Sequence, residues 1–431
     1  MTGEPERSGV PAREVPAREV PAREAPGRGV PSPPGPGRPS LLTPAFRQIL
    51  AITFLAFGME AGVRALIPLL VLDRGGDAVM VGIAATAYSL PALLFRPFIG
   101  SVVDSWRHRL MYRAGALASA IIPVLVLLPG IPTIIVVRFL TGTSWGFFTV
   151  SNHSLLAKMA PANRRAEASG IFQSMPAMGQ LVLPGLAVAL YTSTGHETVP
   201  VLVAALMGLG AFALVMRMHV PQPTRPAAGD ERVSLVQRIF EPSAIPPTVI
   251  LITSFSAYSI FTVFAPVYVV THLGAPVELL AVYYPIFGLA QAISQPIFGR
   301  FADRLGRAAS ITLGASLAAV ALLVAAIRVE GLPEMVTFTL AAVIYALAQS
   351  FVNPTISAAV MERAPKHRVG SAMATWSIGF QFATGTSSLL WGAIIATWGF
   401  TWLFVAGVGF QVLAILLGRL VLGSPRSRPA I

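Results

Sequence analysis

The sequence predicts an all-α integral membrane protein whose twelve transmembrane helices form two pseudo-symmetric bundles of six. Three observations predict this fold class. First, 54% of the 431 residues are hydrophobic and only 12% are charged, whereas soluble domains carry about 25% charged residues. Second, long apolar runs alternate with short polar gaps from Phe46 onward. Third, residue patterns in the first half of the chain return in the second half, as expected for a duplicated unit.

The composition also excludes several classes of function. Without cysteine the chain has no disulfide, zinc–thiolate site or thiol nucleophile. The six histidines are scattered without ligand-like pairing, which argues against a metal site. A formal charge of +12 would suit a nucleic-acid partner, but the basic residues lie in a tail and in the short gaps between apolar runs. We therefore expect contact with membrane lipid and no nucleic acid.

Residues 1–44 are expected to be a disordered, Pro/Arg-rich tail. The pentapeptide Val-Pro-Ala-Arg-Glu occurs three times between Val10 and Glu24, and a stretch rich in Pro, Gly and Ser follows. Such a segment cannot bury enough apolar surface to fold. It lacks the apolar core of a signal peptide, so we expect no cleavage for export. A basic arm that touches lipid headgroups is the alternative.

The apolar runs are long enough for spanning helices, which need about 20 mostly apolar residues. The twelve runs cover residues 46–72, 78–101, 111–129, 132–155, 166–191, 198–216, 248–271, 277–299, 309–328, 334–359, 370–396 and 400–422. The predicted organisation is a first bundle over 45–216, a central loop over 217–247, a second bundle over 248–422 and a tail over 423–431.

The basic residues predict the orientation of the helices. They concentrate in the tails and in alternate gaps, whereas the opposite gaps hold only Arg74 and Arg328. Cytoplasmic loops carry the excess of Lys and Arg. We therefore expect both termini and the central loop in the cytoplasm, and a multi-pass protein of the cell (plasma or inner) membrane.

An internal repeat relates the two halves. The matched segments are Pro97–Asp104 with Pro296–Asp303 at an offset of 199, Gly170 and Gly179 with Gly370 and Gly379 at an offset of 200, and Ala160-Pro161 with Ala364-Pro365 at an offset of 204. Near-equal offsets at equivalent places in the helix order indicate a duplicated six-helix unit. Many transporters alternate access to a site between two such units.

On these residues the chain resembles the major facilitator superfamily over 46–422. The superfamily's loop signature reads roughly Gly-x-x-x-Asp-Arg/Lys-x-Gly-Arg-Arg, and Gly299–Arg307 matches it closely. The first copy, Gly100–Arg109, lacks the second glycine and the first Arg. The resemblance implies a conformational latch, with topology signalling as the alternative role of the Arg residues. The latch candidates are Gly100, Asp104, Arg107, Arg109, Gly299, Asp303, Arg304, Gly306 and Arg307.

Two further motifs are similar to patterns of the superfamily. Arg138-Phe-Leu-Thr-Gly142 matches the helix 4 pattern Arg-x-x-x-Gly. The fifth run carries an antiporter-like pattern of Gly170, Gly179, Pro184 and Gly185, with Leu183 in place of a glycine. The resemblance ties this pattern to exporters that exchange substrate for protons. The alternative is that these residues only pack and bend a helix.

Glu60 is the one acidic residue deep in a predicted span. A charge there costs about 2.5–3.5 kcal/mol on insertion scales, so it needs a partner or water. Arg64 shares its helix face, and Arg138 lies at a similar depth. Twelve-helix drug–proton antiporters, which the chain resembles, carry such an acid and Arg. If rocking or substrate arrival changes their pairing, the carboxyl can gain and lose a proton. The alternatives are a permanent Glu60–Arg64 bridge and an Arg that anchors an anionic substrate.

Other polar and aromatic residues at membrane depth lie on the helices that line the central cavity in the superfamily. These candidates are Tyr88, Trp145, Gln173, Gln180, Tyr258, Tyr284, Gln291, Tyr345, Gln349, Trp376 and Gln381. Each of them would serve equally well as a contact between helices. As a set they favour an amphipathic or apolar organic substrate.

The leading hypothesis is a monomeric secondary transporter that exports a drug or metabolite by proton antiport. It needs no cofactor, because the proton gradient drives it. An importer, working as a proton symporter or uniporter, is the alternative. An enzyme is disfavoured because one buried Glu provides no cluster of catalytic groups. A non-transporting receptor is disfavoured because no soluble signalling domain is evident.

Overall fold

A computed structural model describes Gly3 and residues 42–103, 108–159, 165–219, 241–327, 332–365 and 369–423. Within these ranges every regular element is helical, and Leu41–Ile431 is one compact unit. Apart from Gly3, the predicted N-terminal tail up to residue 41 lies outside the described residues, as do most of the predicted central loop and the C-terminal residues 424–431.

The first half of the chain forms six long helical segments in sequence order. They are α1 (Pro44–Asp73), α2 (Ala78–Val103), α3 (His108–Ile121) continued by the 3-10 segment η1 (Ile122–Leu127), α4 (Ile131–Met159), α5 (Arg165–Thr194) and α6 (Thr198–Arg217). Helix α1 begins at a conventional cap: the Thr43 hydroxyl accepts a hydrogen bond from the Phe46 amide at 3.2 Å, and Pro44 occupies the first turn.

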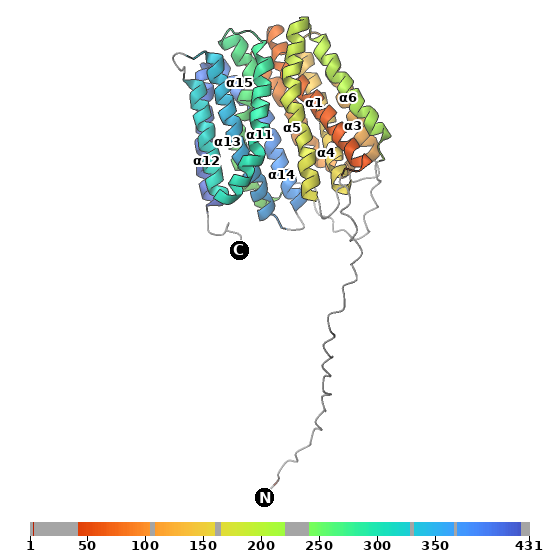
Figure 1. The fold of residues 1–431 in the computed structure, drawn as a ribbon, viewed down its shortest axis with the longest axis vertical. Helices are drawn as coiled ribbons and strands as arrows, with labels where there is room; N and C mark the ends of the chain where they lie inside the picture. The colour runs from red at the N-terminus through yellow and green to blue at the C-terminus, as the bar shows by residue number, and fades with distance from the viewer. Residues whose placement is uncertain are drawn as a thin grey trace, which may run out of the picture. The chain divides into compact units, whose positions relative to one another are not determined.

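The second half repeats this plan with more interruptions. Its elements are η3 (Pro242–Ala244), α8 (Ile245–Phe255), α9 (Tyr258–Thr262), α10 (Ala265–Val267), the π-helical η4 (Tyr268–His272), α11 (Leu279–Leu305), α12 (Arg307–Ala326), α13 (Glu334–Arg363), α14 (Val369–Gln381), the π-helical η5 (Phe382–Thr386) and α15 (Ser387–Leu422). The helices of the two halves run roughly side by side (Figure 1).

The helices account for all twelve predicted spans. Within the described residues nine stretches are long and apolar enough to cross a membrane, and Ala78–Pro91 and Leu279–Gln295 are shorter apolar helices. One of the nine, Ala372–Leu422, is 51 residues long, far more than the roughly 20 that one crossing needs. It holds two spans, because Gly399 at φ 81° ends one helix and begins the next. The predicted fold class is therefore confirmed.

The duplicated unit is visible in equivalent glycine contacts. Gly115 of α3 packs against α4, and Gly314 of α12 packs against α13. Gly208 of α6 faces α1 and α3, and Gly407 of α15 faces α9 and α12. Each pair is separated by 199 positions, the offset of the first matched segments. Small residues at the same places allow the same close helix packing in each half.

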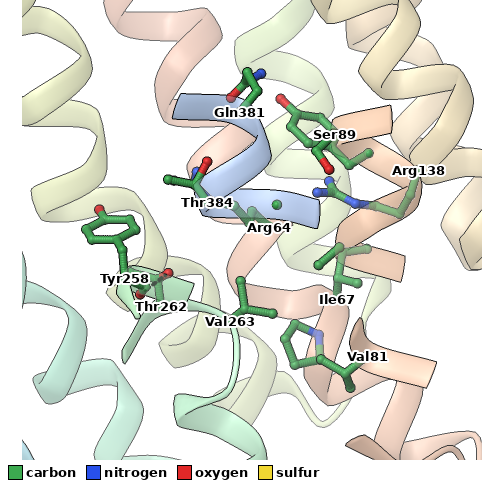
Figure 2. A pocket seen from close by; sticks show the side chains of 14 residues that line it. Arg64, Ile67, Val81, Ser89, Arg138, Tyr258, Thr262, Val263, Gln381 and Thr384 are labelled. Atoms are coloured by element: carbon green, nitrogen blue, oxygen red, sulfur yellow. Dashed lines mark hydrogen bonds between the residues drawn. The ribbon is translucent and has the colours of Figure 1, made fainter. Parts of the chain in front are cut away.

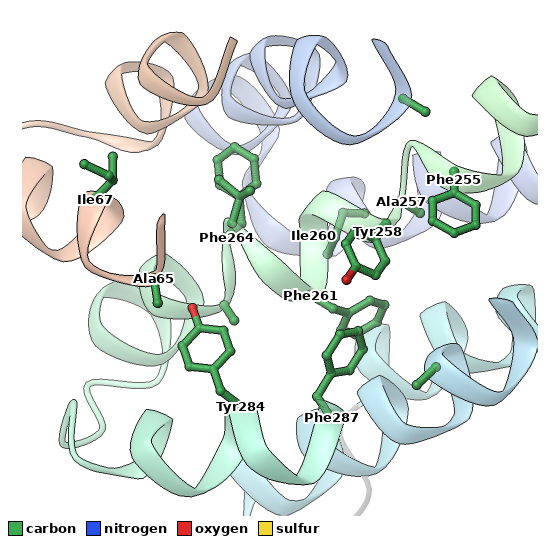
Figure 3. Close-up of a cluster of buried hydrophobic side chains, with 14 of the residues drawn as sticks. Ala65, Ile67, Phe255, Ala257, Tyr258, Ile260, Phe261, Phe264, Tyr284 and Phe287 are labelled. Atoms are coloured by element: carbon green, nitrogen blue, oxygen red, sulfur yellow. The ribbon is translucent and has the colours of Figure 1, made fainter. Parts of the chain in front are cut away.

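The seventh span is broken between α8 and α9. The Ser254 carbonyl at this break accepts hydrogen bonds from Tyr345 Oη at 3.1 Å, Gln349 Nε2 at 3.3 Å and Gln411 Nε2 at 3.0 Å. Backbone that leaves the helical pattern inside a membrane needs such partners. Buried aromatic rings pack around the break (Figure 3). Among them, the ring centre of Tyr258 lies 5.9 Å from the ring centre of Phe287 in α11.

The two halves touch at the ends of the spans that lie away from Pro44. There α2 packs against η5 and α15, and α5 packs against α11. Glycines permit this approach, since a Cβ at Gly82 would lie 2.5 Å from the Ser388 carbonyl oxygen and one at Gly185 would lie 2.7 Å from the Ala281 carbonyl oxygen. The bundle is therefore closed at that end.

Candidate functional site

A buried cluster of charges lies between α1 and α4. The Glu60 carboxylate is 3.8 Å from Arg64 Nε through Oε2 and 3.8 Å from Arg138 Nη1 through Oε1. Glu60 is 6% exposed and Arg138 is 3% exposed, whereas the Arg64 side chain is 35% exposed. The structure thus brings together the three charged residues that the sequence singled out.

The packing of α2 against α4 completes the cluster. The Arg138 guanidinium carbon lies 4.0 Å from the centre of the Tyr88 ring, a cation–π distance. Gly142 follows Arg138 by one turn and lies directly against the Tyr88 backbone, where a Cβ would overlap the Tyr88 carbonyl. The Arg-x-x-x-Gly motif therefore combines a buried cation with the glycine that brings an aromatic ring to it.

The cluster is loosely bonded. Glu60 Oε1 and the Nε and Nη1 atoms of Arg138 are buried without a hydrogen-bond partner among the described residues. Buried polar atoms are normally hydrogen-bonded, and exceptions often mark functional groups. Two guanidinium groups share one carboxylate at ion-pair distances longer than hydrogen bonds. The cluster can therefore accept another ligand or a changed protonation state without breaking strong bonds.

Three cavities meet beside this cluster, and Tyr258 lines all of them. The first, of about 60 Å³, lies between Arg64 and Arg138 on one side and Gln381 and Thr384 on the other (Figure 2). A second, of about 310 Å³, is central and draws on α1, α4, α5, α8, α9, α11, α13 and α14. A third, of about 30 Å³, joins Arg64 to Tyr284 of α11.

The large cavity lies in the half of the bundle nearer to Pro44. Its lining residues His153, Gln295, Asn353 and Trp376 lie toward the ends of α4, α11, α13 and α14 on that side. The cavity of about 60 Å³ beside Arg64 lies toward the end where the halves touch. The charge cluster is therefore placed between the large cavity and the closed end.

The walls of the large cavity are aromatic and polar but not acidic. Its rings and amides come from both halves, and no Asp or Glu lines any of the three cavities formed by the described residues. Asn353 Oδ1 and Trp376 Nε1 are buried without a hydrogen-bond partner in the described structure. His153 Nδ1 lies 2.8 Å from the Thr149 carbonyl oxygen and donates its hydrogen to it. The Asn353 and Trp376 atoms can meet a substrate's hydrogen-bonding groups.

The predicted cavity residues separate into three groups. Those that line the large cavity are Trp145, Gln180, Tyr258, Gln291, Trp376 and Gln381. Tyr88 and Tyr284 line the smaller cavities. Tyr345 and Gln349 line none of the three and instead bond the Ser254 carbonyl. The side chain of Gln173 lies outside the described residues.

Sequence reasoning missed His153, Gln295 and Asn353, which also line the large cavity. A signal was available for one of them. The offset of 204 that relates the Ala-Pro pairs also relates Thr149 to Asn353, and both residues line this cavity.

The residues of the predicted latch are only partly described. Asp104 and Arg107 lie outside the described residues, as do the surroundings of Gly100, Gly299 and Asp303. Arg109 and Arg304 are exposed. Gly306 joins α11 to α12 at φ 84°, a conformation that favours glycine. Arg307 Nη2 is 2.6 Å from Glu362 Oε1 of α13.

The helix 5 motif forms contacts on both sides of α5. Gly179 lies against Gly58 of α1, and Gly185 lies against Ala281 of α11 in the other half. Pro184 lies within α5 and lines the smallest cavity. Gly170 is in α5, but its surroundings lie outside the described residues.

A duplicated bundle of membrane-spanning helices around a central cavity defines a multi-pass membrane transporter. The family model of the Major Facilitator Superfamily matches residues 49–290 and 280–431. The chain belongs to this superfamily, which confirms the resemblance seen in its motifs.

The comparisons with individual proteins agree with this placement. The chain is 24% identical over 148 residues to the staphylopine export protein of Staphylococcus aureus, a match that spans 34% of this chain and 37% of that relative. The nucleoside transporter NupG shares the fold with a TM-score of 0.70, 12% identity and coverage of 89% of this chain and 100% of that chain. A POT family transporter in complex with 5-aminolevulinic acid gives a TM-score of 0.72, 14% identity and coverage of 89% and 96%.

Proposed function

We propose that the protein exports a small organic molecule across the cell membrane in exchange for protons, by alternating access. The observation that carries this proposal is Glu60, a buried acid held between two guanidinium groups beside the cavities. An ionisable residue at membrane depth is expensive and commonly marks an ion or substrate pathway. Glu60 is the proton carrier in this scheme, and the proton gradient supplies the energy without a cofactor.

The arrangement of the cavities supports loading from the cytoplasm. The halves touch at one end, and the large cavity lies toward the other. The basic residues of the sequence support a cytoplasmic location for that other end. The conformation is then the one that receives substrate from inside the cell. One chain holds both halves of the pathway, so a monomer suffices.

The placement of the cluster restricts how coupling operates. Glu60, Arg64, Arg138 and Tyr88 all belong to α1, α2 and α4 of the first half. Rigid rocking of one half against the other leaves their mutual distances unchanged. Rocking instead changes which residues of the second half cover the cluster and which side admits water. Proton exchange therefore depends on changed access and on substrate binding beside Arg64.

Two observations support the outward direction. The relative from Staphylococcus aureus is named as an export protein. The fifth helix carries the antiporter-like glycines, and Gly185 lies at the closed contact with α11. These glycines can seal the outer side while substrate enters from within.

Co-transport of substrate and proton is the second candidate, and one observation favours it. Arg64 lines two cavities, whereas Glu60 lines none of the three. A hydrogen-bond acceptor group of the substrate that bound to Arg64 would compete with Glu60 for the same guanidinium. A proton on Glu60 could then accompany the substrate, which would make the protein a proton-coupled importer.

Everted membrane vesicles distinguish the two candidates. Compounds are chosen from those whose toxicity to a pump-deficient host changes, in either direction, when the protein is expressed, and each is added to vesicles with an acidic lumen. Under proton exchange the compound discharges the pH gradient, because protons leave as substrate enters. Under co-transport the lumen does not lose protons when substrate is added. A change in toxicity, whether protection or sensitisation, that persists after the proton gradient is dissipated would contradict both forms of coupling.

A further inference from the structure

We infer that the transported molecule is an organic anion whose negative group binds to Arg64. This inference rests on the proposed function only in taking the three cavities as the substrate's path. It does not depend on the direction of transport or on proton exchange.

The charges of the cluster do not balance without a bound anion. Among the residues that the structure describes, two guanidinium groups, Arg64 and Arg138, meet a single carboxylate, Glu60. Arg keeps its positive charge in proteins, so an ionised Glu60 leaves one positive charge unbalanced. Buried charges are stable when they are paired and hydrogen-bonded. A bound anion would supply the missing partner and leave two cations with two anions.

Arg64 is the cation of the cluster that is accessible to a ligand. Arg138 is 3% exposed and lies over the Tyr88 ring, so it remains with Glu60. The side chain of Arg64 is 35% exposed and lines both cavities next to the cluster. Its approach to Glu60 is 3.8 Å through Nε, too long for a hydrogen bond. A guanidinium in this state can bind a carboxylate through two parallel hydrogen bonds.

The walls of the cavities disfavour a cationic substrate. The residues that line the three cavities include no Asp or Glu in the described structure. A cation in these cavities would meet Arg64 without an opposing carboxylate on the wall. The electrostatic character of the path therefore favours negative ligands over positive ones.

The walls of the large cavity describe the rest of the molecule. Phe57 and Trp145 of the first half lie with ring centres 4.8 Å apart, and Trp376 and Phe380 of the second half stack at 5.5 Å. All four rings line the cavity. Aromatic side chains pack well against planar apolar groups. The ligand is then an amphipathic anion with a planar, aromatic body between the two halves and its anionic group toward Arg64.

The test compares ligands that have the same shape and different charge. Purified full-length protein in lipid nanodiscs is titrated with 2-naphthoate, 2-naphthamide and 2-naphthylmethylammonium, and the same three head groups are then compared on phenyl and indole bodies. Binding is measured by isothermal titration calorimetry. We expect carboxylates to bind at least tenfold more tightly than the matching amides and ammonium compounds. The absence of a carboxylate that binds more tightly than its amide in any of the three series would overturn the inference.

Variants of Arg64 locate the binding group. Arg64→Gln is expected to remove most of the preference for carboxylate, and Arg64→Lys to retain part of it, because Lys keeps the charge and loses the planar fork. Arg217→Gln, at the exposed end of α6, is the matched control and should keep the full preference. A carboxylate preference that survives in a folded Arg64→Gln protein would refute the assignment of Arg64.

The charge series on the unmodified protein needs no variant, so it remains decisive if Arg64→Gln fails to fold. It is also separate from the proposed function. Carboxylate binding that depends on Arg64 without proton flux in vesicles would leave the inference intact and reject proton exchange. Proton exchange with neutral compounds and no carboxylate preference would support proton exchange and reject the inference that the substrate is an anion.

Discussion

Gly142 of α4 lies against the backbone carbonyl of Tyr88 in α2, and this contact places the Tyr88 ring beside the buried Arg138 guanidinium. The Arg-x-x-x-Gly motif of Arg138 and Gly142 thus acts through a third residue, Tyr88, on another helix. The relationship links helix packing to the electrostatic environment of Glu60.

Substitution of this glycine should disturb both packing and coupling. In Gly142→Ala the new Cβ would overlap the Tyr88 carbonyl, which forces α2 away from α4. Overpacking of this kind costs about 1–3 kcal/mol. We expect a lower Tm in a detergent melt and weaker substrate-driven proton flux in vesicles. Gly409→Ala is the control, because a Cβ there meets nothing within 4 Å, and an unchanged Tm in both variants would argue against the contact.

Removal of the acid should abolish coupling without removing the protein from the membrane. Glu60→Gln cannot exchange a proton but keeps nearly the same volume between Arg64 and Arg138. We expect normal membrane insertion and loss of gradient-driven transport in everted vesicles. Glu278→Gln at the exposed start of α11 should transport normally. Undiminished gradient-driven transport in the Glu60 variant would end its role as proton carrier.

A disulfide across the closed end should lock the transporter. Ser89 Oγ of α2 and Thr386 Oγ1 of η5 are 3.1 Å apart and belong to different halves. The chain has no cysteine of its own, so Ser89→Cys with Thr386→Cys introduces one defined pair. Sulfur atoms that replaced these oxygens would have to approach by about 1 Å to reach the S–S bond length of about 2.05 Å. We expect oxidation to stop transport and reduction to restore it.

A matched pair within one half provides the control for this crosslink. Ser119 Oγ and Ser144 Oγ are 3.2 Å apart, on α3 and α4 of the first half. The disulfide between Ser119→Cys and Ser144→Cys should leave transport intact, because the halves still move. If both disulfides had the same effect on transport, opening at the α2–η5 contact would not be part of the cycle.

Tyr345 should contribute to stability more than to substrate affinity. Its hydroxyl donates to the Ser254 carbonyl at the break between α8 and α9. Tyr345→Phe removes one hydrogen bond, worth about 0.5–1.5 kcal/mol, and leaves a buried carbonyl with fewer partners. We expect a lower Tm with unchanged ligand affinity. Trp376→Phe removes a cavity-lining indole N–H. This variant should weaken ligand affinity and leave the Tm unchanged.

The number and order of the spans followed from the sequence, because hydrocarbon thickness sets helix length. The association of Glu60 with Arg64 also followed, since residues four apart share a helix face. Arg138 was placed beside them by membrane depth and by family resemblance. The break in the seventh span was not predicted. The sequence pattern of an apolar run that contains proline and glycine does not distinguish a continuous helix from an interrupted one.

The cavity lining was predictable only in part. Membrane depth and polarity identified Trp376 and Gln381 as well as Tyr345 and Gln349, but they do not show which side of a helix faces the cavity. The last two residues bond the helix break instead. In the sequence His153 is one of six scattered histidines without ligand-like pairing, yet it lines the large cavity. Side-chain direction in a bundle depends on helix rotation, which short apolar sequences leave undetermined.

Among the described residues, the two guanidinium groups of Arg64 and Arg138 meet one carboxylate, Glu60. This imbalance of charge affects the free energy of the conformational change in a membrane. In the proposed exchange the protein returns with a proton on Glu60, so the returning site carries the two positive charges of Arg64 and Arg138, whereas a site with an ionised Glu60 and a bound monovalent anion is neutral. The conformational change of the returning, protonated protein would then move charge through the membrane. Each elementary charge that crosses the full field contributes about 2.3 kcal/mol per 100 mV. The transport rate should therefore respond to membrane voltage even when the pH is equal on both sides.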